Sequence, residues 1–369
     1  MEVKPGYKQT EIGVIPEEWE VVALGSVTTT VASGKSSSGV GQGTYPVHGS
    51  TGIIGYTERP EYEGDSILAA RVGANAGKLN LVSGKYGVTD NTIMLRLRGG
   101  YSLAFVWRQL ETKHLNSLVF GSGQPLITGS QLKALSLSVP PLPEQRAIAT
   151  ALSDVDGLLG GLDRLIAKKR ALKQAAMQQL LTGQTRLPGF SGEWEETTFG
   201  NVVRHHAGNS TLIKGKLPSS EATGRFPAYS ASGQDVWCDH FEHEGDAIVV
   251  SAVGSRCGKA FMASGNWCAI ANTHVVWPNS AKLDTRFLAY FINDEDFWQK
   301  SGTGQPFVLF TKTFARPLRL PKLPEQTAIA EVLTEMDGEL AVLEQRREKT
   351  RALKQAMMQE LLTGKIRLL

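Results

Sequence analysis

Two short stretches of the sequence carry residues of the kind that enzymes use, but each departs from the pattern that its chemistry requires. Gly73-Ala-Asn-Ala-Gly77-Lys78 is similar to a phosphate-binding loop. It has three residues rather than four between its glycines, however, and Leu79 stands where such a loop needs serine or threonine. His48-Gly-Ser50-Thr-Gly52 does not match the G-x-S-x-G turn that exposes a serine nucleophile. We therefore expect a tight turn at the first stretch and no nucleophile at the second.

Motifs that would hold a metal ion or a cofactor are missing from the sequence. It contains no H-E-x-x-H zinc motif and no G-x-G-x-x-G dinucleotide fingerprint. It also lacks the Asn/Asp-Pro-Pro-Tyr/Phe tetrapeptide, which resembles what an amino-methyltransferase would carry. The prediction is a chain with no catalytic residues, no metal ligands and no cofactor of its own.

A duplication extends over nearly the whole chain. Residues 142–187 and 323–368 match at an offset of 181 positions, with 27 of 46 pairs identical. The same offset relates shorter segments upstream, among them Gly121–Pro125 with Gly302–Pro306 and Glu63–Ile67 with Glu244–Ile248. The period is too long for a solenoid repeat and indicates two similar domains.

The cysteines favour a structural role over a metal site. They are odd in number and lie in the second half of the chain, at Cys238, Cys257 and Cys268. His240 and His243 lie nearby, so zinc is one hypothesis. The matched positions in the first half are not cysteine, so the domain plan works without them. We expect reduced, buried thiols in a reducing compartment.

Each copy of the repeat ends in a predicted helix of about 40 residues, or ~60 Å at 1.5 Å per residue. Apolar residues alternate steps of four and three, the seam of a coiled coil. The predicted seam consists of Ile148, Leu152, Val155, Leu159, Leu162 and Ile166 in the first helix, and of Ile329, Leu333, Met336, Leu340 and Leu343 in the second. Pro143 and Pro324 suit helix starts, and Gly183 and Gly364 suit C-terminal caps.

Charge favours pairing of these two helices with each other. Residues 144–183 hold six Lys/Arg and four Asp/Glu, whereas residues 325–364 hold five Lys/Arg and eight Asp/Glu. The net charges are therefore opposite in sign, and an antiparallel pair about a pseudo-two-fold axis is expected. A core helix of one large domain, or a general oligomerisation coil, is the alternative interpretation.

The fold class predicted is α+β, with two similar globular domains joined by two long antiparallel coiled-coil helices. The expected divisions are 1–141 for the first globular domain, 142–186 for the central helix, 187–321 for the second domain and 322–369 for the C-terminal helix. Within the domains we expect buried strands at Asp65–Ala70 and Asp246–Ser251, a hairpin or meander over Lys78–Arg98, and short helices at Ser102–Glu111 and Asp284–Ile292.

Size and composition fit a soluble chain of two to three domains. The length of 369 residues corresponds to that number at about 150 residues each. No apolar run approaches the ~20 residues of a membrane span, and the start lacks a signal-peptide core, so we expect the cytoplasm and no membrane partner. A net charge of +3 is weak evidence for nucleic-acid binding.

A resemblance gives a more specific expectation. LPEQRAIA and LPEQTAIA open the two helices, LLTG-x-x-RL ends both, and IPEEWE and FSGEWEE precede the globular domains. In this combination, spanning nearly all of the chain, the sequence resembles the specificity (S) subunit of type I restriction-modification systems.

The resemblance implies two target-recognition domains, each reading one half of a split sequence in double-stranded DNA. The helices would set the spacing and dock two methyltransferase (M) subunits, and two restriction/translocase (R) subunits would complete the complex. S-adenosylmethionine, ATP and Mg would belong to these partners, so this chain would be no enzyme. Because the two halves differ in sequence, the target should be asymmetric.

DNA contacts are expected from loop residues, with Arg and Lys on phosphates and Arg, Asn, Gln or Ser on base edges. The candidates are Lys35, Ser36, His48, Arg71, Asn75, Lys78 and Gln124 in the first domain, and Lys214, Lys216, Tyr229, Arg256, Lys259 and Gln305 in the second. Positions that differ between the copies, such as Asn75 and Arg256, are the predicted base readers. Shared positions are the predicted backbone contacts.

Two other functions fit the duplicated sequence less well. One is a coiled-coil adaptor without sequence-specific DNA binding. The other is a self-sufficient DNA-modifying enzyme, against which the missing cofactor motifs count.

Overall fold

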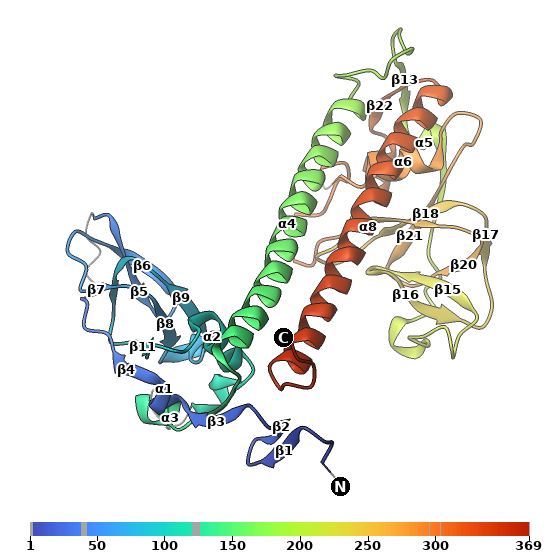
Figure 1. Ribbon diagram of the computed structural model, residues 1–369. Helices are drawn as coiled ribbons and strands as arrows, with labels where there is room; N and C mark the ends of the chain where they lie inside the picture. The colour runs from blue at the N-terminus through green and yellow to red at the C-terminus, as the bar shows by residue number, and fades with distance from the viewer. Residues whose placement is uncertain (1–2, 38–42, 120–125, 295, 303, 369) are drawn as a thin grey trace. The chain divides into compact units, whose positions relative to one another are not determined.

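The computed structural model describes residues 3–37, 43–119, 126–294, 296–302 and 304–368 (Figure 1). The chain divides into two compact units, one of Met1–Asp163 with Gln345–Leu369 and one of Arg164–Glu344. Each unit therefore combines one globular domain with one half of each long helix. Among the described residues, no helix has both the length and the apolar content that a membrane crossing requires.

The two long helices are α4 (Leu142–Leu180) and α8 (Leu323–Leu361), each of 39 residues. Both end just before a left-handed turn, in which Gly183 and Gly364 have φ of +72°. Glycine adopts this conformation without the steric cost that a Cβ atom brings. Both predicted helices are present, but they end at Leu180 and Leu361, before the predicted ends at residues 186 and 369. The glycines expected after each helix lie in these turns.

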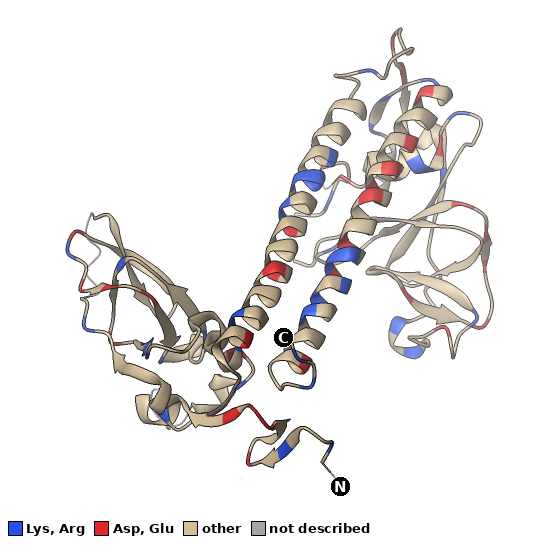
Figure 2. Ribbon diagram, in the orientation of Figure 1, with Lys and Arg blue, Asp and Glu red and all other residues tan. Residues whose placement is uncertain are grey.

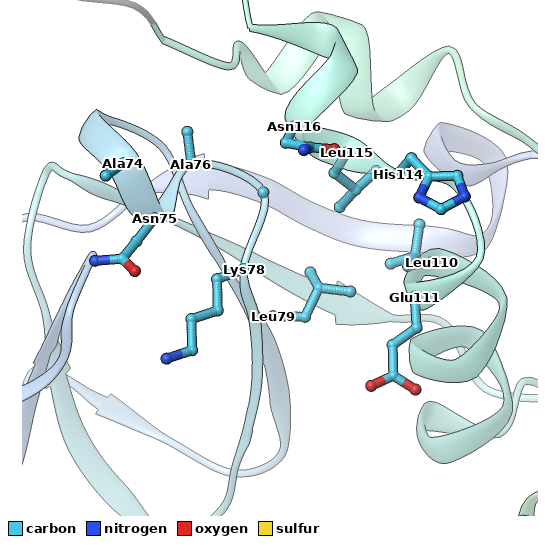
Figure 3. A pocket seen from close by; sticks show the side chains of 11 residues that line it. Ala74, Asn75, Ala76, Lys78, Leu79, Leu110, Glu111, His114, Leu115 and Asn116 are labelled. Atoms are coloured by element: carbon cyan, nitrogen blue, oxygen red, sulfur yellow. The ribbon is translucent and has the colours of Figure 1, made fainter. Parts of the chain in front are cut away.

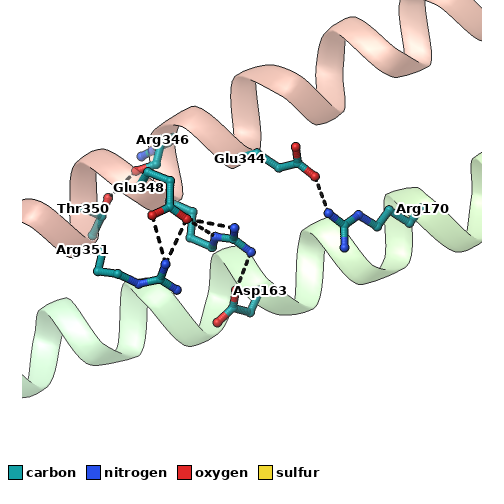
Figure 4. Close-up of polar contacts among 8 residues, drawn as sticks. Asp163, Arg170, Glu344, Arg346, Glu348, Thr350 and Arg351 are labelled. Atoms are coloured by element: carbon teal, nitrogen blue, oxygen red, sulfur yellow. Dashed lines mark hydrogen bonds and ion pairs between the residues drawn. The ribbon is translucent and has the colours of Figure 1, made fainter. Parts of the chain in front are cut away.

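Ion pairs show that the helices run antiparallel. In the second unit Lys173 lies 2.5 Å from Asp337, and in the first unit Lys354 lies 2.7 Å from Asp156. Figure 4 shows a further pair, Arg170 with Glu344 in the second unit. Asp163 pairs with Arg347 in the first unit. The number on α8 falls as the number on α4 rises within each unit, as the antiparallel expectation requires.

Opposite charges are matched between halves of the two long helices rather than between the helices as wholes. Figure 2 shows that acidic residues lie mainly in the first half of each helix and most basic residues in the second. An antiparallel pair places the acidic half of one helix beside the basic half of the other. This pattern refines the sequence expectation, which used only the net charge of each helix.

The predicted seam positions differ in burial. Seven are buried, namely Ile148, Leu152, Leu162, Ile166, Ile329, Leu333 and Leu340. The other four, Val155, Leu159, Met336 and Leu343, are half-buried. Ile148 and Leu152 pack into the core of the first domain, and Ile329 and Leu333 into that of the second. The helices are thus anchored in the domains as well as paired.

The first globular domain contains two four-stranded sheets. One has the order β4 (Thr28–Ser33), β11 (Thr92–Leu97), β8 (Ser66–Ala70), β9 (Leu79–Val82), and the other has β6 (Gly52–Thr57), β5 (Tyr45–Gly49), β10 (Lys85–Val88), β7 (Tyr62–Glu63). Two antiparallel two-stranded sheets complete it, β1 (Tyr7–Thr10) with β2 (Gly13–Pro16) and β3 (Glu20–Ala23) with β12 (Ser136–Val139). Its shorter helices are α1 (Leu24–Val27), α2 (Leu103–Glu111), α3 (Gly129–Lys133), η1 (Gly73–Asn75) and η2 (Leu115–Leu118).

The second globular domain repeats both sheets in the same order. One runs β14 (Val203–Ala207), β21 (Thr273–Pro278), β18 (Ala247–Ser251), β19 (Ala260–Ala263), and the other runs β16 (Gly233–Cys238), β15 (Phe226–Ser230), β20 (Asn266–Ala269), β17 (His243–Glu244). The remaining elements are the pair β13 (Glu195–Thr198) and β22 (Pro317–Leu320), with α5 (Phe199–Val202), α6 (Thr285–Ile292), α7 (Phe310–Phe314) and η3 (Lys214–Lys216). The duplication seen in the sequence is therefore a duplication of topology.

Most predicted elements are present. Every residue of β8 and β18 is buried. Helix α2 begins after Ser102, whose hydroxyl accepts from the Phe105 amide, and α6 begins after Asp284, whose carboxylate accepts from the Arg286 and Phe287 amides. Both are ordinary N-caps.

The meander predicted over Lys78–Arg98 is wrong. Strand β9 pairs with β8, β10 pairs with β5 and β7, and β11 lies between β4 and β8. Three consecutive strands thus join two different sheets. Alternation along a strand reports which face is buried, not which strand is its neighbour, so the pattern could not show this crossing.

Candidate functional site

The glycine-rich loop of the first domain forms one wall of a hollow of about 580 Å³ (Figure 3). Asn75 and Lys78 come from this loop, and Glu111, His114 and Asn116 line the hollow from the end of α2 and from η2. Gly77 has φ of +88°, and a Cβ atom there would lie 2.6 Å from the backbone nitrogen of Asn116. Only glycine allows the loop to approach η2 this closely.

The matching loop of the second domain is more basic and less open. Arg256 and Lys259 line a hollow of about 80 Å³ together with Lys300 and Asn293. Gly258 has φ of +90°, and a Cβ atom there would lie 2.9 Å from the ring of Trp298. Here a buried indole occupies the position that the η2 backbone takes in the first domain.

Hydrogen bonds identify both loops as consecutive tight turns. The Ala76 amide donates to the Gly73 carbonyl and the Lys78 amide to the Asn75 carbonyl. The second loop repeats both bonds, from Cys257 to Gly254 and from Lys259 to Arg256. These amides form hydrogen bonds within the turns, so the loop is not a phosphate-binding loop. A tight turn was the prediction from the sequence. Lys78 and Lys259 project from it and are exposed.

Other first-domain candidates divide into exposed and engaged residues. Lys35 is exposed, whereas Ser36 is buried and its hydroxyl accepts from the Val88 amide and donates to Glu61. His48 is half-buried, and burial lowers its pKa. Arg71 is half-buried and donates to the Ser33 hydroxyl at 3.3 Å. Gln124 lies outside the described residues.

Lys35 and Ser36 also line a second hollow of about 450 Å³, together with the turn between β5 and β6 (Gly49–Thr51). Asn91 also lines it, and its carbonyl accepts from the Arg71 amide. The structure thus brings Lys35, Ser36 and the Arg71 backbone to one region of the first domain.

In the second domain, the turn between β15 and β16 links several candidates. Arg256 donates to the Ser232 carbonyl in this turn at 3.4 Å, and Tyr229 lies in the strand before it. Burial raises the pKa of Tyr229, which meets the ring of Trp267 edge-on at 5.9 Å. Gln305 is exposed beside Gly254 at the start of the glycine-rich loop.

The two lysines of η3 differ in whether they pair with an acidic side chain. Lys214 pairs with Asp235 of that strand, and Lys216 is exposed. The Lys214 ammonium is therefore partly neutralised, whereas that of Lys216 is available to an anion.

Two matched arginine–glutamate pairs explain the motifs that open and close the long helices. In the first unit Arg367 donates to Glu144 at 2.6 and 2.8 Å, and Trp19 donates to the same carboxylate at 3.1 Å. In the second unit Arg186 donates to Glu325 at 2.5 and 2.6 Å. Both glutamates are buried. The hydrogen bonds that each arginine donates to its carboxylate raise the pKa of that arginine.

Among the described residues, no group of three or more His, Cys, Asp or Glu side chains could hold a metal ion. All three cysteines are buried and free of disulfides.

The model of the type I restriction modification DNA specificity domain matches residues 16–167 and again residues 192–351. The chain belongs to this family. Each match covers one globular domain and most of the long helix that follows it, so the family unit is the repeat.

Relatives of similar length support the assignment. The chain is 25% identical to a putative type I restriction enzyme specificity subunit, MjaX, of Methanocaldococcus jannaschii, over 98% of this chain and 96% of the relative. It is 24% identical to the MjaVIII specificity subunit of the same organism, over 96% and 94%. The solved S subunit of M. genitalium has the same fold, with a TM-score of 0.68 at 17% identity over 98% of both chains.

The chain is thus a type I restriction-modification specificity subunit with two target-recognition domains, and DNA binding follows from the family.

One group of side chains near β14, β17 and β21 could not be predicted from the sequence. His206, His243 and Trp277 are far apart in the sequence and gather only through strand pairing.

Proposed function

We propose that the chain is the non-catalytic DNA-reading subunit of a type I restriction-modification complex, in which each domain reads one half of a split, asymmetric target. The observation that carries the proposal is the pair of glycine-rich loops. They share backbone and turn geometry, but carry Asn75 in one domain and Arg256 in the other. Asparagine suits adenine and arginine suits guanine in the major groove.

The helices would set the spacing between the halves of the target and dock the partners. Leu172 and Leu353 occupy matched positions of the repeat, and they are 49% and 55% exposed. Each unit therefore carries one such leucine on its share of the helices, which fits the docking of two M subunits. Those subunits would supply S-adenosylmethionine binding and adenine methylation, and R subunits would supply ATP- and Mg-dependent translocation and cleavage, all in the cytoplasm.

Mapping methylated adenines in the host genome tests the reading of a split target. The expected result is one bipartite, asymmetric motif that disappears when this chain is deleted. Exchanging residues 1–141 for the first domain of another specificity subunit should change one half of the motif only. A methylome without a bipartite motif, with the M gene intact and expressed, would contradict the proposal.

Native mass spectrometry of the complex tests the docking. Leu172→Glu and Leu353→Glu should each remove one M subunit, and the double variant should remove both. Val342→Glu, at an exposed helix position that is 65% accessible, is the control. Full assembly of the double variant would place the docking surface elsewhere.

A further inference from the structure

A hollow of about 330 Å³ opens in the second domain beside β14, β17 and β21. Its wall includes Arg204, His206, Glu242, His243, Glu244 and Trp277. None of these residues is among the DNA contacts predicted from the sequence. A volume at the lower limit of ordinary ligand sites suits one small planar group.

Aromatic rings form the inner wall of this hollow. The ring centroid of Trp277 lies 4.8 Å from that of His206 and 5.4 Å from that of His243. Behind them Trp267 is fully buried, stacks on Trp277 at 6.3 Å and meets Tyr229 edge-on. A continuous row of rings thus connects the hollow to Tyr229, one of the proposed DNA contacts.

The wall offers a stacking face rather than a cationic one. Burial lowers the pKa of His243, so its imidazole is neutral near pH 7. Trp277 is half-buried, which leaves part of the indole accessible. Stacking on an aromatic side chain is worth roughly 1–3 kcal/mol for a nucleic-acid base and does not depend on which base it is.

Hydrogen-bond acceptors lie at the rim. Glu244 is exposed. The side chain of Glu242 is 25% accessible and accepts a hydrogen bond from the Asn209 side-chain amide. Carboxylates accept from amino groups and repel phosphates and other carboxylates. Arg204 also lines the hollow, and its guanidinium lies 5.9 Å over the Trp277 ring.

We propose that this hollow binds a single nucleobase with an exocyclic amino group, adenine above all, stacked on Trp277 with its amino group donating to Glu242 or Glu244. The inference rests on the proposed DNA-reading function for its setting. The base can come from DNA, as an unpaired nucleotide next to the target, or from a free adenine nucleotide. Arg204 would meet the attached phosphate in either case.

The first domain has no equivalent among its described residues. Arg96 stands at the position that matches Trp277, and its guanidinium donates to the Glu63 carbonyl at 2.8 Å and to the Ser66 hydroxyl at 3.3 Å. Tyr62 stands in place of His243 and stacks on Tyr86. The proposed base site therefore belongs to one domain only.

Fluorine NMR of the full chain labelled with 5-fluorotryptophan tests the inference, with the Trp277 signal assigned from Trp277→Phe. Adenosine monophosphate should shift this signal. Inosine monophosphate, which carries a carbonyl in place of the amino group, should bind at least about fivefold more weakly. Glu244→Gln should reduce this preference. In Trp277→Leu, followed through the signal of the neighbouring Trp267, binding of both should be abolished. Phe241→Leu, at an exposed site outside the lining, is the matched control.

A second titration separates the two sources of the base. An oligonucleotide duplex with one unpaired adenine acting at tenfold lower concentration than the monophosphate would indicate a DNA base, and the reverse order a free nucleotide. Equal binding of the two monophosphates, or binding that survives Trp277→Leu, would overturn the inference. That result would leave the split methylation motif unaffected, so the two proposals can fail separately.

Discussion

Each unit has a junction at which the end of one long helix meets a tryptophan near the start of the globular domain, and the two junctions are built differently. In the first unit, Trp19 and Pro16 reach Gly364 at the end of α8 through space, and the Tyr7 hydroxyl donates to the Gly364 carbonyl at 3.1 Å. In the second unit, Trp194 packs against Gly183 only eleven residues earlier in the chain. One junction is held by side chains alone, and the other is also held by the backbone that links its parts.

This difference shows which contacts the repeat depends on. The arginine–glutamate pair is present at both junctions, whereas among the described residues a tryptophan donates to that glutamate only at the first junction, from Trp19. The indole nitrogen of Trp194 is buried and has no partner among the described residues. Where the chain itself maintains proximity, the polar contacts are fewer.

Loss of the junction arginine should have the largest effect. Arg367→Met leaves the buried Glu144 carboxylate without its cation, and breaking a buried pair in this way costs about 3–5 kcal/mol. Arg186→Met should cost less, because residues 187–194 keep the parts of the second junction together. Urea unfolding of the two variants, with exposed Arg319→Met as the control, measures the difference. Equal losses would show that chain connectivity contributes nothing.

A Cβ atom in the glycine-rich loops should have the next largest effect. Gly77→Ala combines a left-handed φ with a clash against backbone, so we expect a loss of roughly 3 kcal/mol in the free energy of unfolding. Gly258→Ala meets a side chain that can shift, so its loss should be smaller. Gly84→Ala is the control, because its φ is +75° and its Cβ would meet open space. If all three variants lost the same stability, strain alone would explain the glycines.

The base-reading residues should affect affinity rather than stability. Arg256→Ala should weaken binding of the complex to its target about 5- to 150-fold, the range expected for one good base contact, and should relax only one half of the motif. Asn75→Ala should relax the other half. Lys78→Ala and Lys259→Ala, as phosphate contacts, should weaken binding without changing the motif and should reduce its salt dependence. Methylation assays on target variants at two salt concentrations distinguish these outcomes.

The sequence predicted which helices and strands form better than it predicted which strands pair with one another. Repeat offset, helix period and capping residues are local signals, and they gave α4, α8, α2 and α6 together with the buried strands β8 and β18. The crossing of β9, β10 and β11 between sheets depends on pairing, which leaves no mark on spacing. The family motifs could be recognised in the sequence. The pairing of Glu144 with Arg367, 223 residues apart, is visible only in the three-dimensional structure.

Among the residues proposed to contact DNA, residue type alone did not predict which side chains are exposed. Lys35, Lys78 and Lys259 are exposed, as a phosphate contact requires. Ser36 satisfies its hydroxyl inside the fold, and nothing in the sequence distinguishes it from an exposed serine. The rings around Trp277 could not be predicted as a group, because β14, β17 and β21 come from three separate segments of the chain.

The smallest expected effect concerns one aspartate in each unit. Asp156 pairs with Lys354 and Asp337 with Lys173, at matched positions of the repeat. Asp156 also pairs with the buried Arg108, whereas Asp337 accepts from the Tyr290 hydroxyl at 2.6 Å. Asp156→Asn should therefore cost about 1 kcal/mol, since Arg108 keeps only Glu111 as a partner, and Asp337→Asn should cost less.

The pKa of Asp156 determines how its contribution to stability changes with pH. Burial acts to raise the pKa of Asp156, but its hydrogen bonds and charge interactions with Lys354 and Arg108 outweigh burial and lower it. A carboxyl whose pKa is lower in the folded state stabilises the fold above its unfolded value of about 3.9 and loses this contribution as pH falls through the folded value. Unfolding midpoints of the wild type and Asp156→Asn should therefore differ at pH 6 and converge below about pH 4. A difference that persisted unchanged in acid would show that Asp156 acts through packing rather than charge.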